Sequence, residues 1–484
     1  MNDSDNGNVL STLEGFTFRR VHLLGVAGTG MGSFAGMLKA AGYVVTGSDD
    51  KVYPPMSDML RTWGIDVMTP YQPGNLDAAK PDLVVTGNVI RKVNVEATAV
   101  RERRIPQVSF PQALGELFLA KAHSVVVAGT HGKTTTSALM GHVLTSAGRD
   151  PSFLVGGVTQ NYAGNYRLGR GPHVVVEGDE YDTAYFDKGP KFLHYAPKSL
   201  ILTSIEFDHA DIYRDMAHYT QAFERLVALV PAQGVIAVSA AYPNAVAIAK
   251  KSAARVVTYA ADHPADVTVR DLRFDEQGSH FTVVDGSTLT PVTLALSGHH
   301  NVENALSVWV IARSLGLSPS EVAQGLATFS GVKRRQEVRG EPKGILVIDD
   351  FAHHPTAVRE TLAAIKARYP TRRLWAVFEP RSNTSRRNIH QEDYAKSFSG
   401  AALVRLKVPE AHDKIPKGEE LDVVQLVADL NAQGFDAAGD ASVEGLVRSV
   451  AMGARSGDVI LVMSNGAFGG FIDTLLAQLG APLS

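Results

Sequence analysis

Residues 124–136 have the sequence Ser-Val-Val-Val-Ala-Gly-Thr-His-Gly-Lys-Thr-Thr-Thr, and a helix-length segment follows them up to Gly148. A buried strand that ends in a glycine-rich turn and continues into a helix directs backbone N–H groups and the positive helix terminus at one point, where phosphate binds. Lys133 adds positive charge for the outer phosphates, and the hydroxyl of Thr134 can ligate Mg²⁺. The stretch therefore predicts a nucleotide-phosphate loop, with contacts from Gly129, Thr130, His131, Gly132, Lys133, Thr134 and Thr135.

This loop matches the general P-loop pattern only in part, because that pattern would place a glycine at Val127. The simplest alternative is a Gly-Lys-Thr tripeptide that occurs by chance. Strand, turn, Gly132-Lys133-Thr134 and helix occur together here, and this combination favours phosphate binding.

The same order of strand, turn and helix begins twice more, at residues 21–24 and at residues 344–348. A chain of 484 residues is too long for one hydrophobic core, since cores stop growing at roughly 250–300 residues. Alternating short β-branched runs and helix-length segments are typical of α/β folds with parallel sheets. We therefore predict three α/β domains: a Rossmann-like domain at 1–120, a central P-loop domain with a mostly parallel sheet at 121–331, and a second Rossmann-like domain at 332–484.

Composition excludes several classes of function. The formal net charge is −3, so no basic surface for nucleic acid or an anionic membrane is expected. The absence of cysteine rules out disulfides, thiolate metal sites and thiol nucleophiles. Residues 1–15 lack the features of a signal peptide, and no apolar run is long enough to cross a bilayer. We expect a cytoplasmic protein with small-molecule ligands.

Two predicted strands of the central domain end in acidic or imidazole side chains. Residues 174–176 are followed by Glu177-Gly178-Asp179-Glu180, and residues 200–203 by Ser204-Ile205-Glu206-Phe207-Asp208-His209. The carboxyl ends of parallel strands meet at one sheet edge, where such groups can hold Mg²⁺ beside a nucleotide. We predict that Glu177 is a metal ligand, whereas Asp179, Glu180 and Glu206 fit solvated loop residues equally well.

The turn at residues 25–32 resembles a dinucleotide-binding fingerprint but does not keep its spacing, because Ser33 stands where the third glycine belongs. Asp49 follows the next strand, where an acid often meets a ribose. The pattern predicts a site for a diphosphate, and a nicotinamide oxidoreductase remains an open alternative.

Two histidine pairs, at 299–300 and 353–354, precede helix-length segments. Adjacent side chains point apart, and a third ligand at helical spacing is missing. Helix caps with satisfied histidines explain both pairs better than a metal site does.

Taken together, the motifs resemble the Mur ligases, ATP-dependent enzymes of peptidoglycan metabolism that form amide bonds. The resemblance covers nearly the whole chain. It rests on the phosphate loop and on four further segments: 177–180, 208–209, 298–304 and 349–355.

Four stretches are similar to the branch of the family that recycles murein peptide: 53–57, 180–188, 378–384 and 464–470. The implied reaction joins UDP-N-acetylmuramate to the tripeptide L-alanyl-γ-D-glutamyl-meso-diaminopimelate with ATP and two Mg²⁺ ions. Addition of L-alanine is the alternative within the family, and a regulatory P-loop ATPase is an alternative outside it. The oligomeric state is not predicted.

The resemblance also implies roles for individual residues. Lys133, Glu177 and His209 would be catalytic, with Thr134, Glu177 and His209 as metal ligands. UDP would contact Gly28, Thr29, Gly30, Met31, Ser48 and Asp49. Further contacts to ATP would come from Asn301, Asn304, Arg335, Asp350 and His353. Ser204 departs from the family, in which asparagine is often found at this position.

Arg381, Asn383 and Thr384 follow a predicted strand of the third domain. A guanidinium group suits bidentate pairing with a carboxylate, so we predict that these three residues bind the peptide. A structural arginine that caps nearby carbonyl groups is the alternative.

Overall fold

The computed structural model describes residues 6–480, except for residues 163, 211, 411–414 and 416–417. The chain forms two compact units. One contains Met1–Glu206, Met216–Thr268 and Ala305–Leu326, and the other contains Phe207–Asp215, Val269–Asn304 and Ala327–Ser484. Three separate sheets, mostly parallel, confirm the predicted α/β fold. The domain boundaries at 120 and 331 stay a prediction.

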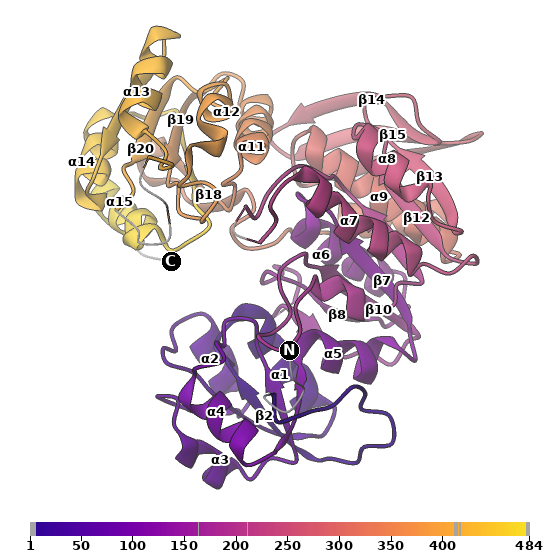
Figure 1. Cartoon of the computed structure of the whole chain (residues 1–484). Helices are drawn as coiled ribbons and strands as arrows, with labels where there is room; N and C mark the ends of the chain where they lie inside the picture. The colour runs from indigo at the N-terminus through magenta and orange to yellow at the C-terminus, as the bar shows by residue number, and fades with distance from the viewer. Residues whose placement is uncertain (1–5, 163, 211, 411–414, 416–417, 481–484) are drawn as a thin grey trace. The chain divides into compact units, whose positions relative to one another are not determined.

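The N-terminal sheet has six parallel strands in the order β1-β6-β5-β2-β3-β4. Figure 1 labels β2 of this sheet and the helices α1 to α4. Strand β2 lies between β3 and β5, so the strand order reverses at β2. In α/β sheets, ligands bind at the carboxyl ends of the strands at such a reversal. The elements are β1 (Asn8–Val9), β2 (Arg20–Leu24), α1 (Thr29–Ala40), β3 (Val44–Ser48), α2 (Met56–Thr62), β4 (Asp66–Met68), α3 (Pro73–Ala79), β5 (Leu83–Thr86), α4 (Val95–Glu102), β6 (Pro106–Ser109) and α5 (Phe110–Leu114).

The central sheet has ten strands in the order β16-β15-β14-β13-β12-β11-β7-β10-β8-β9. Strand β7, which leads into the predicted phosphate loop, pairs in parallel with β11 on one side and β10 on the other. The strands are β7 (His123–Ala128), β8 (Ser152–Leu154), β9 (Tyr166–Arg167), β10 (His173–Gly178), β11 (Ser199–Leu202), β12 (Val235–Ser239), β13 (Arg255–Tyr259), β14 (Val267–Asp275), β15 (Gly278–Asp285) and β16 (Thr288–Leu294). The helices are α6 (Lys133–Ser146), α7 (Met216–Ala228), α8 (Pro243–Ala249), α9 (His299–Ser314) and α10 (Pro319–Ala327).

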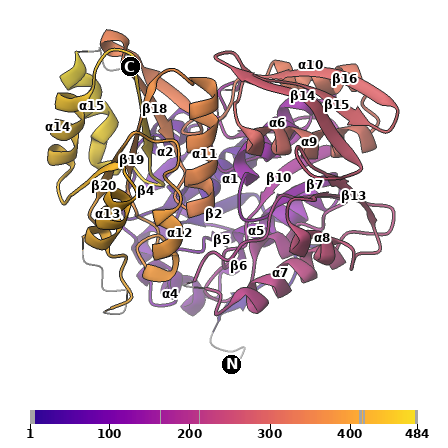
Figure 2. The same cartoon turned by 90° about the horizontal axis from the view of Figure 1, so that it is seen from above.

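The C-terminal sheet has the order β17-β18-β22-β19-β20-β21. Among its described strands, only the edge pair β17–β18 is antiparallel. Helices α11 and α12 lie on one side of the strands and α14 and α15 on the other (Figure 2). Each face buries its own apolar cluster. The elements are β17 (Glu337–Gly340), β18 (Leu346–Asp350), α11 (Pro355–Arg368), β19 (Arg373–Phe378), α12 (Gln391–Ala395), β20 (Leu403–Lys407), α13 (Val423–Ala432), β21 (Asp436–Asp440), α14 (Val443–Gly453), β22 (Asp458–Met463) and α15 (Phe471–Leu479).

Strands covered on both faces explain the continuous apolar runs in the sequence. Val125, Val126 and Val127 of β7 are fully buried, as are Ile460 and Leu461 of β22, which is the pattern of strands inside a parallel sheet. The helices are short, and within the described ranges none is both long and apolar enough to cross a membrane.

Candidate active site

The predicted phosphate loop connects the end of β7 to the start of α6. Gly129 has a φ of +130°, and a Cβ atom there would lie 2.2 Å from Oγ1 of Thr203. Gly132 precedes the helix with a φ of +77°. Only glycine adopts such backbone angles at little energetic cost, so both glycines are needed for the shape of the loop itself.

Neighbouring strand β11 supports this loop through the two residues that follow it. The backbone N–H of Thr130 donates to the carbonyl of Ser204 at 2.9 Å, and Oγ1 of Thr203 donates to the carbonyl of His131 at 2.6 Å. Oγ of Ser204 accepts from the N–H of His131 at 3.0 Å. The serine that departs from the family pattern therefore holds the loop backbone.

The side chain of Lys133 is 13% exposed and contacts groups of the central domain. Its Nζ lies 2.6 Å from the carbonyl oxygen of Gly129 and 2.9 Å from Oε2 of Glu180. Burial lowers the pKa of Lys133, but the carboxylates of Glu180, Asp179 and Glu177 outweigh that effect and raise it. The ammonium group is therefore charged at neutral pH and ready to neutralise phosphate.

Glu177, at the end of β10, lies beside the first turn of α6. Its Oε1 accepts from Oγ1 of Thr134 at 3.0 Å, and its Oε2 accepts from the N–H of Gly156 at 2.8 Å. Burial raises the pKa of Glu177, although Lys133 opposes the shift. Two adjacent hard oxygen atoms of this kind fit Mg²⁺, so Thr134 and Glu177 are the residues here that suit a metal.

Sequence reasoning missed Gly156, which follows β8 and leaves room for the carboxylate of Glu177. A Cβ atom at Gly156 would lie 2.6 Å from Oε2 of Glu177. The signal was the Gly156-Gly157 pair directly after the apolar residues Phe153 to Val155. Such a pair marks a strand end at which two backbones approach closely.

Glu180 and Tyr219 also belong to this cluster. The carboxylate of Glu180 is fully buried against Lys133, and the hydroxyl of Tyr219 donates to it at 3.2 Å. The same hydroxyl lies 3.2 Å from Oγ1 of Thr130. Glu180 is thus a buried ion-pair partner and not a solvated loop residue.

Asp179 and Glu206 are also paired. Asp179 forms an ion pair with Lys191, with 2.8 Å between the charged atoms. Oε2 of Glu206 lies 2.7 Å from Nε2 of His131. These contacts place the side chain of His131 against Glu206 in this conformation.

The N-terminal domain places the predicted UDP residues around the start of α1. Gly28 is the N-cap, and Thr29, Gly30 and Met31 form the first helical residues. Oδ2 of Asp49 accepts from the N–H of Ala27 at 2.9 Å, which ties the end of β3 to this turn.

Two members of the predicted UDP set are turned inward. Met31 is 6% exposed and Ser48 is fully buried. Oγ of Ser48 donates to Oε1 of Glu96 at 3.0 Å. The side chain of Ser48 therefore offers no surface to a nucleoside, which differs from the expected contact.

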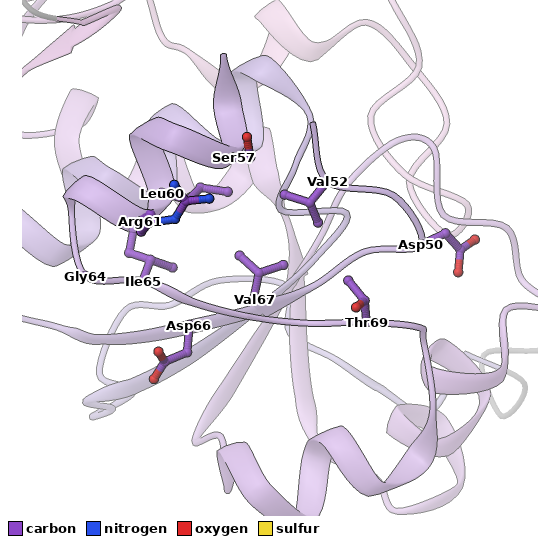
Figure 3. A pocket seen from close by; sticks show the side chains of 10 residues that line it. All are labelled: Asp50, Val52, Ser57, Leu60, Arg61, Gly64, Ile65, Asp66, Val67 and Thr69. Carbon is purple, nitrogen blue, oxygen red and sulfur yellow. The ribbon is translucent and has the colours of Figure 1, made fainter. Parts of the chain in front are cut away.

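A cavity of about 490 Å³ lies between α2 and the strand β4. Figure 3 shows Ser57, Leu60 and Arg61 from α2 on one side and the segment Ile65 to Thr69 on the other. Asp50 and Val52, from the loop after β3, also line it. Charged, polar and apolar side chains line this cavity, and its volume lies within the range of small-molecule sites.

The remaining residues predicted to contact ATP or a metal lie in the second compact unit: His209, Asn301, Asn304, Arg335, Asp350 and His353. Within that unit, Nδ2 of Asn301 donates to the carbonyl of Ser297 at 2.8 Å. Arg335 stacks on the ring of Phe351, with its guanidinium carbon 4.8 Å from the ring centre.

Asp350 differs from its predicted role as a group that closes over ATP. It is 4% exposed, and its two oxygen atoms accept the backbone N–H groups of Gln336 and Ala352, both at 2.8 Å. Burial raises the pKa of Asp350, opposed by Arg335. Its geometry is that of a carboxylate that fixes the backbone after β18.

The predicted peptide site lies at the carboxyl ends of β19 and β22. The guanidinium group of Arg381 packs on Gly466, where a Cβ atom would lie 1.3 Å from Nη1. Oγ of Ser464 donates to Oε2 of Glu379 at 2.5 Å and links the two loops. Arg381 is exposed and Asn383 is half-buried, whereas Thr384 is 5% exposed and presents little surface for a ligand.

Comparison with known protein families shows three matches along the chain. Residues 20–122 match "Mur ligase family, catalytic domain", residues 127–312 match "Mur ligase middle domain" and residues 334–466 match "Mur ligase, glutamate ligase domain". The chain belongs to the Mur ligase family. This Mur ligase carries its phosphate loop at the start of the middle-domain match.

Two curated relatives cover most of this Mur ligase. The UDP-N-acetylmuramate–L-alanyl-γ-D-glutamyl-meso-2,6-diaminoheptandioate ligase of Escherichia coli K12 is 40% identical over 95% of this chain and 98% of its own length. The UDP-N-acetylmuramate–L-alanine ligase of Desulfotalea psychrophila is 32% identical over 92% and 95%.

A solved structure gives the same result. The murein peptide ligase of Psychrobacter arcticus is 34% identical, with a TM-score of 0.71, over 97% of this chain and 100% of that protein. The family, the fold and the class of enzyme, a ligase that forms amide bonds, are thereby shown.

Proposed function

We propose that this Mur ligase joins the carboxylate of UDP-N-acetylmuramate to the amino group of L-alanyl-γ-D-glutamyl-meso-diaminopimelate, with ATP, in peptidoglycan recycling. The observation that carries the proposal is the 40% identity to the E. coli enzyme over nearly the full length of both chains. The alanine-adding relative is 32% identical over a similar span.

The chemistry follows from the substrates, because a carboxylate is a poor acyl donor. The γ-phosphoryl group of ATP passes to the lactyl carboxylate and forms an acyl phosphate. The peptide amine then attacks the carbonyl carbon, and the tetrahedral intermediate releases phosphate. Holding the reactants in line supplies much of the rate, since well-oriented neighbours are worth about 7–11 kcal/mol.

Lys133 is the central charge in this scheme. Its ammonium group lies within the loop, where it stabilises the negative charge that develops on the transferred phosphoryl group. ATP must displace Glu180 or share Lys133 with it, because Glu180 takes that charge in the present conformation. Thr134 and Glu177 would hold Mg²⁺, which neutralises phosphate charge during transfer, and His209 would hold a second ion.

The other proposed contacts keep the assignments made from the sequence, except for the three buried side chains of Ser48, Thr384 and Asp350. ATP would be bound by the residues 129–135, Asn301, Asn304, Arg335 and His353, with Asp350 as a backbone tie. UDP would be bound by the first turn of α1 and by Asp49, and the peptide by Arg381 and Asn383. A cytoplasmic location remains part of the proposal.

The test measures phosphate release with ATP, Mg²⁺ and UDP-N-acetylmuramate, with L-alanine in one reaction and the tripeptide in another. We expect turnover with the tripeptide. Turnover with alanine alone would assign the chain to the alanine-adding branch. ATP hydrolysis that does not depend on UDP-N-acetylmuramate would contradict ligation altogether.

The acceptor site has a separate test in Arg381→Ala. We expect the KM for the tripeptide to rise by roughly tenfold, because a charged hydrogen bond is worth about 1.5–3 kcal/mol. The KM for ATP should not change. Gly466→Ala should also raise the KM for the tripeptide, because the new methyl group would displace the guanidinium group of Arg381.

A further inference from the structure

The N-terminal domain buries two ionisable side chains that the proposed chemistry does not use. His22 on β2 and Glu96 in the first turn of α4 are both fully buried, and Nε2 of His22 lies 2.8 Å from Oε1 of Glu96. Burying such a pair is unfavourable unless every remaining polar atom is also satisfied. The surroundings of Glu96 meet that condition.

Glu96 interacts with four polar groups from different elements. Its Oε1 faces His22 and accepts from Oγ of Ser48 at 3.0 Å. Its Oε2 accepts from Nδ2 of Asn75 at 2.9 Å and from the backbone N–H of Gln72 at 3.2 Å. These groups belong to β2, the end of β3, the segment after β4 and the helix α3. One carboxylate thus connects β2, β3, α3 and the segment after β4.

The position of Glu96 is itself fixed. The side chain of Asn94 caps α4 by accepting the N–H groups of Glu96 and Ala97, both at 3.0 Å. A negative charge in the first helical turn is further stabilised by the positive helix terminus. On the other side, Nδ1 of His22 lies 2.8 Å from Oγ1 of Thr46. Neither end of the pair can move without breaking these contacts.

Two of the segments that Glu96 connects lie at the carboxyl ends of the strands, where the nucleotide is expected. Ser48 directly precedes Asp49, and Gln72 directly follows Tyr71. The phenol of Tyr71 hydrogen bonds to Asp49, and Asp49 in turn accepts the N–H of Ala27 in the glycine-rich turn. Asp49 therefore links three loops at the surface, and Glu96 links two of the same loops from beneath.

We propose that Glu96, supported by His22, is a positioning residue for the nucleotide half of UDP-N-acetylmuramate: it holds the Asp49 and Tyr71 loops at the spacing that the ligand requires. The inference rests on the proposed function for the identity of the ligand. It also gives Ser48 a role, since this buried serine acts on the site through Glu96.

If Glu96 only stabilised the fold, its replacement would lower stability without changing nucleotide affinity. Well-packed apolar side chains often stabilise a core as much as a buried ion pair does, so stability alone does not account for a carboxylate here. Two of the donors to Glu96, Ser48 and Gln72, stand directly beside the loops that carry Asp49 and Tyr71 on the ligand side of the sheet. Loss of Glu96 should therefore change nucleotide affinity in addition to any loss of stability.

The test is Glu96→Gln, which keeps the size of the side chain but turns one acceptor atom into an NH₂ group that faces donors. We expect the KM for UDP-N-acetylmuramate and the Kd for UDP, measured by calorimetric titration, to rise by roughly tenfold, because hydrogen bonds to a charged group are lost. The KM values for ATP and tripeptide should remain those of the unmodified enzyme.

Asp82→Asn is the matched control. The carboxylate of Asp82 also binds the backbone of this domain, because it accepts the N–H groups of Arg19 and Arg20 at 2.9 and 2.8 Å. It lies at the amino ends of β2 and β5, away from the carboxyl ends where the ligand is expected. We expect it to leave all three KM values unchanged. A Glu96→Gln enzyme with a lower Tm but an unchanged Kd for UDP would overturn the proposal.

His22→Gln is the second test variant, to be used if Glu96→Gln does not fold. It removes the imidazole partner while Glu96 keeps its other three donors, and we expect a smaller rise in the same two constants. An unchanged Kd for UDP in this variant would also overturn the proposal. The unmodified enzyme separates the two hypotheses: turnover with alanine in place of tripeptide would contradict the proposed acceptor only, and the role of Glu96 would stand.

Discussion

Two glycine-rich turns of this Mur ligase have the same order of strand, turn and helix but are stabilised differently. The turn after β7 contains Lys133, and the structure itself demands Gly129, which has a positive φ and lies against Thr203. The turn after β2 contains no lysine. A Cβ atom at Gly28 or Gly30 would meet its nearest neighbour at 3.6 Å, which is ordinary contact.

This difference separates two reasons for a glycine. In the predicted phosphate loop, Gly129 is needed for the protein to form the turn at all. In the N-terminal turn, the fold itself demands Gly25, which has a φ of +86°, and Gly32, where a Cβ atom would lie 2.2 Å from Sδ of Met56. It leaves room for a methyl group at Gly28 and Gly30, so the space at these two positions is available to a ligand that approaches the backbone. The predicted phosphate loop has the positive charge of Lys133, whereas the N-terminal turn offers an anion only N–H groups and a helix terminus.

The largest effect is expected from Lys133→Ala, which removes the charge that only the predicted phosphate loop contains. We expect kcat to fall by at least roughly 10²–10³-fold, as when one preorganised donor to a transition state is lost. Phosphate release in the complete reaction measures it. Lys188→Ala is the control, because Lys188 is a largely exposed lysine paired with Asp182; a similar loss there would show that the effect is not specific to the loop.

Gly129→Ala should be the next largest. The new Cβ atom would lie 2.2 Å from Oγ1 of Thr203, and a strained φ costs about 1–3 kcal/mol by itself. We expect both a lower Tm and a fall of roughly 10²-fold in kcat/KM for ATP. A variant with normal ATP kinetics would show that the loop tolerates a side chain, and the contrast between the two turns would disappear.

Gly30→Ala tests the other side of the comparison. Residue 30 is in the first turn of α1, where alanine is a better helix former than glycine by about 1 kcal/mol. We expect an unchanged or slightly higher Tm together with a KM for UDP-N-acetylmuramate raised by roughly tenfold, as for the loss of about 1.4 kcal/mol of binding energy. Unchanged kinetics would mean that the ligand does not approach this part of the turn.

The smallest effects are expected from removing one phenol at each site. Tyr219→Phe removes the hydroxyl that bonds to Glu180, and Tyr71→Phe removes the one that bonds to Asp49. Each hydrogen bond is worth about 1 kcal/mol, so we expect a rise of roughly fivefold in the KM for ATP in the first variant and for UDP-N-acetylmuramate in the second. Steady-state kinetics with each substrate varied in turn would show whether the two effects stay separate.

The Tyr71 effect should not depend on pH over the usual assay range. Burial, together with the charges of Asp49, Asp50 and Glu96, raises the pKa of Tyr71 well above that of a free phenol. The phenol therefore stays protonated and continues to donate to Asp49. A ratio of KM values, variant to unmodified enzyme, that changed between pH 7 and pH 9 would contradict this.

The sequence by itself determined the α/β class, the strand-turn-helix order at residues 124–136 and the position of Glu177 at a strand end, because each depends on a short run of residues. Strand, turn and helix follow one another within residues 124–136, and their anion-binding geometry is a property of that local backbone. The same holds for the turn at residues 25–32, whose anion-binding character was predicted although its spacing was irregular.

Only the tertiary structure decided which side chains complete these sites. Gly156 meets Glu177 because β8 and β10 are neighbours in the sheet, and Arg381 packs on Gly466 because β19 pairs with β22. The role of Glu96 depends in the same way on the order β5-β2-β3-β4. Such pairings are set by the order and register of strands far apart along the chain, which local patterns of hydrophobic and polar residues do not specify.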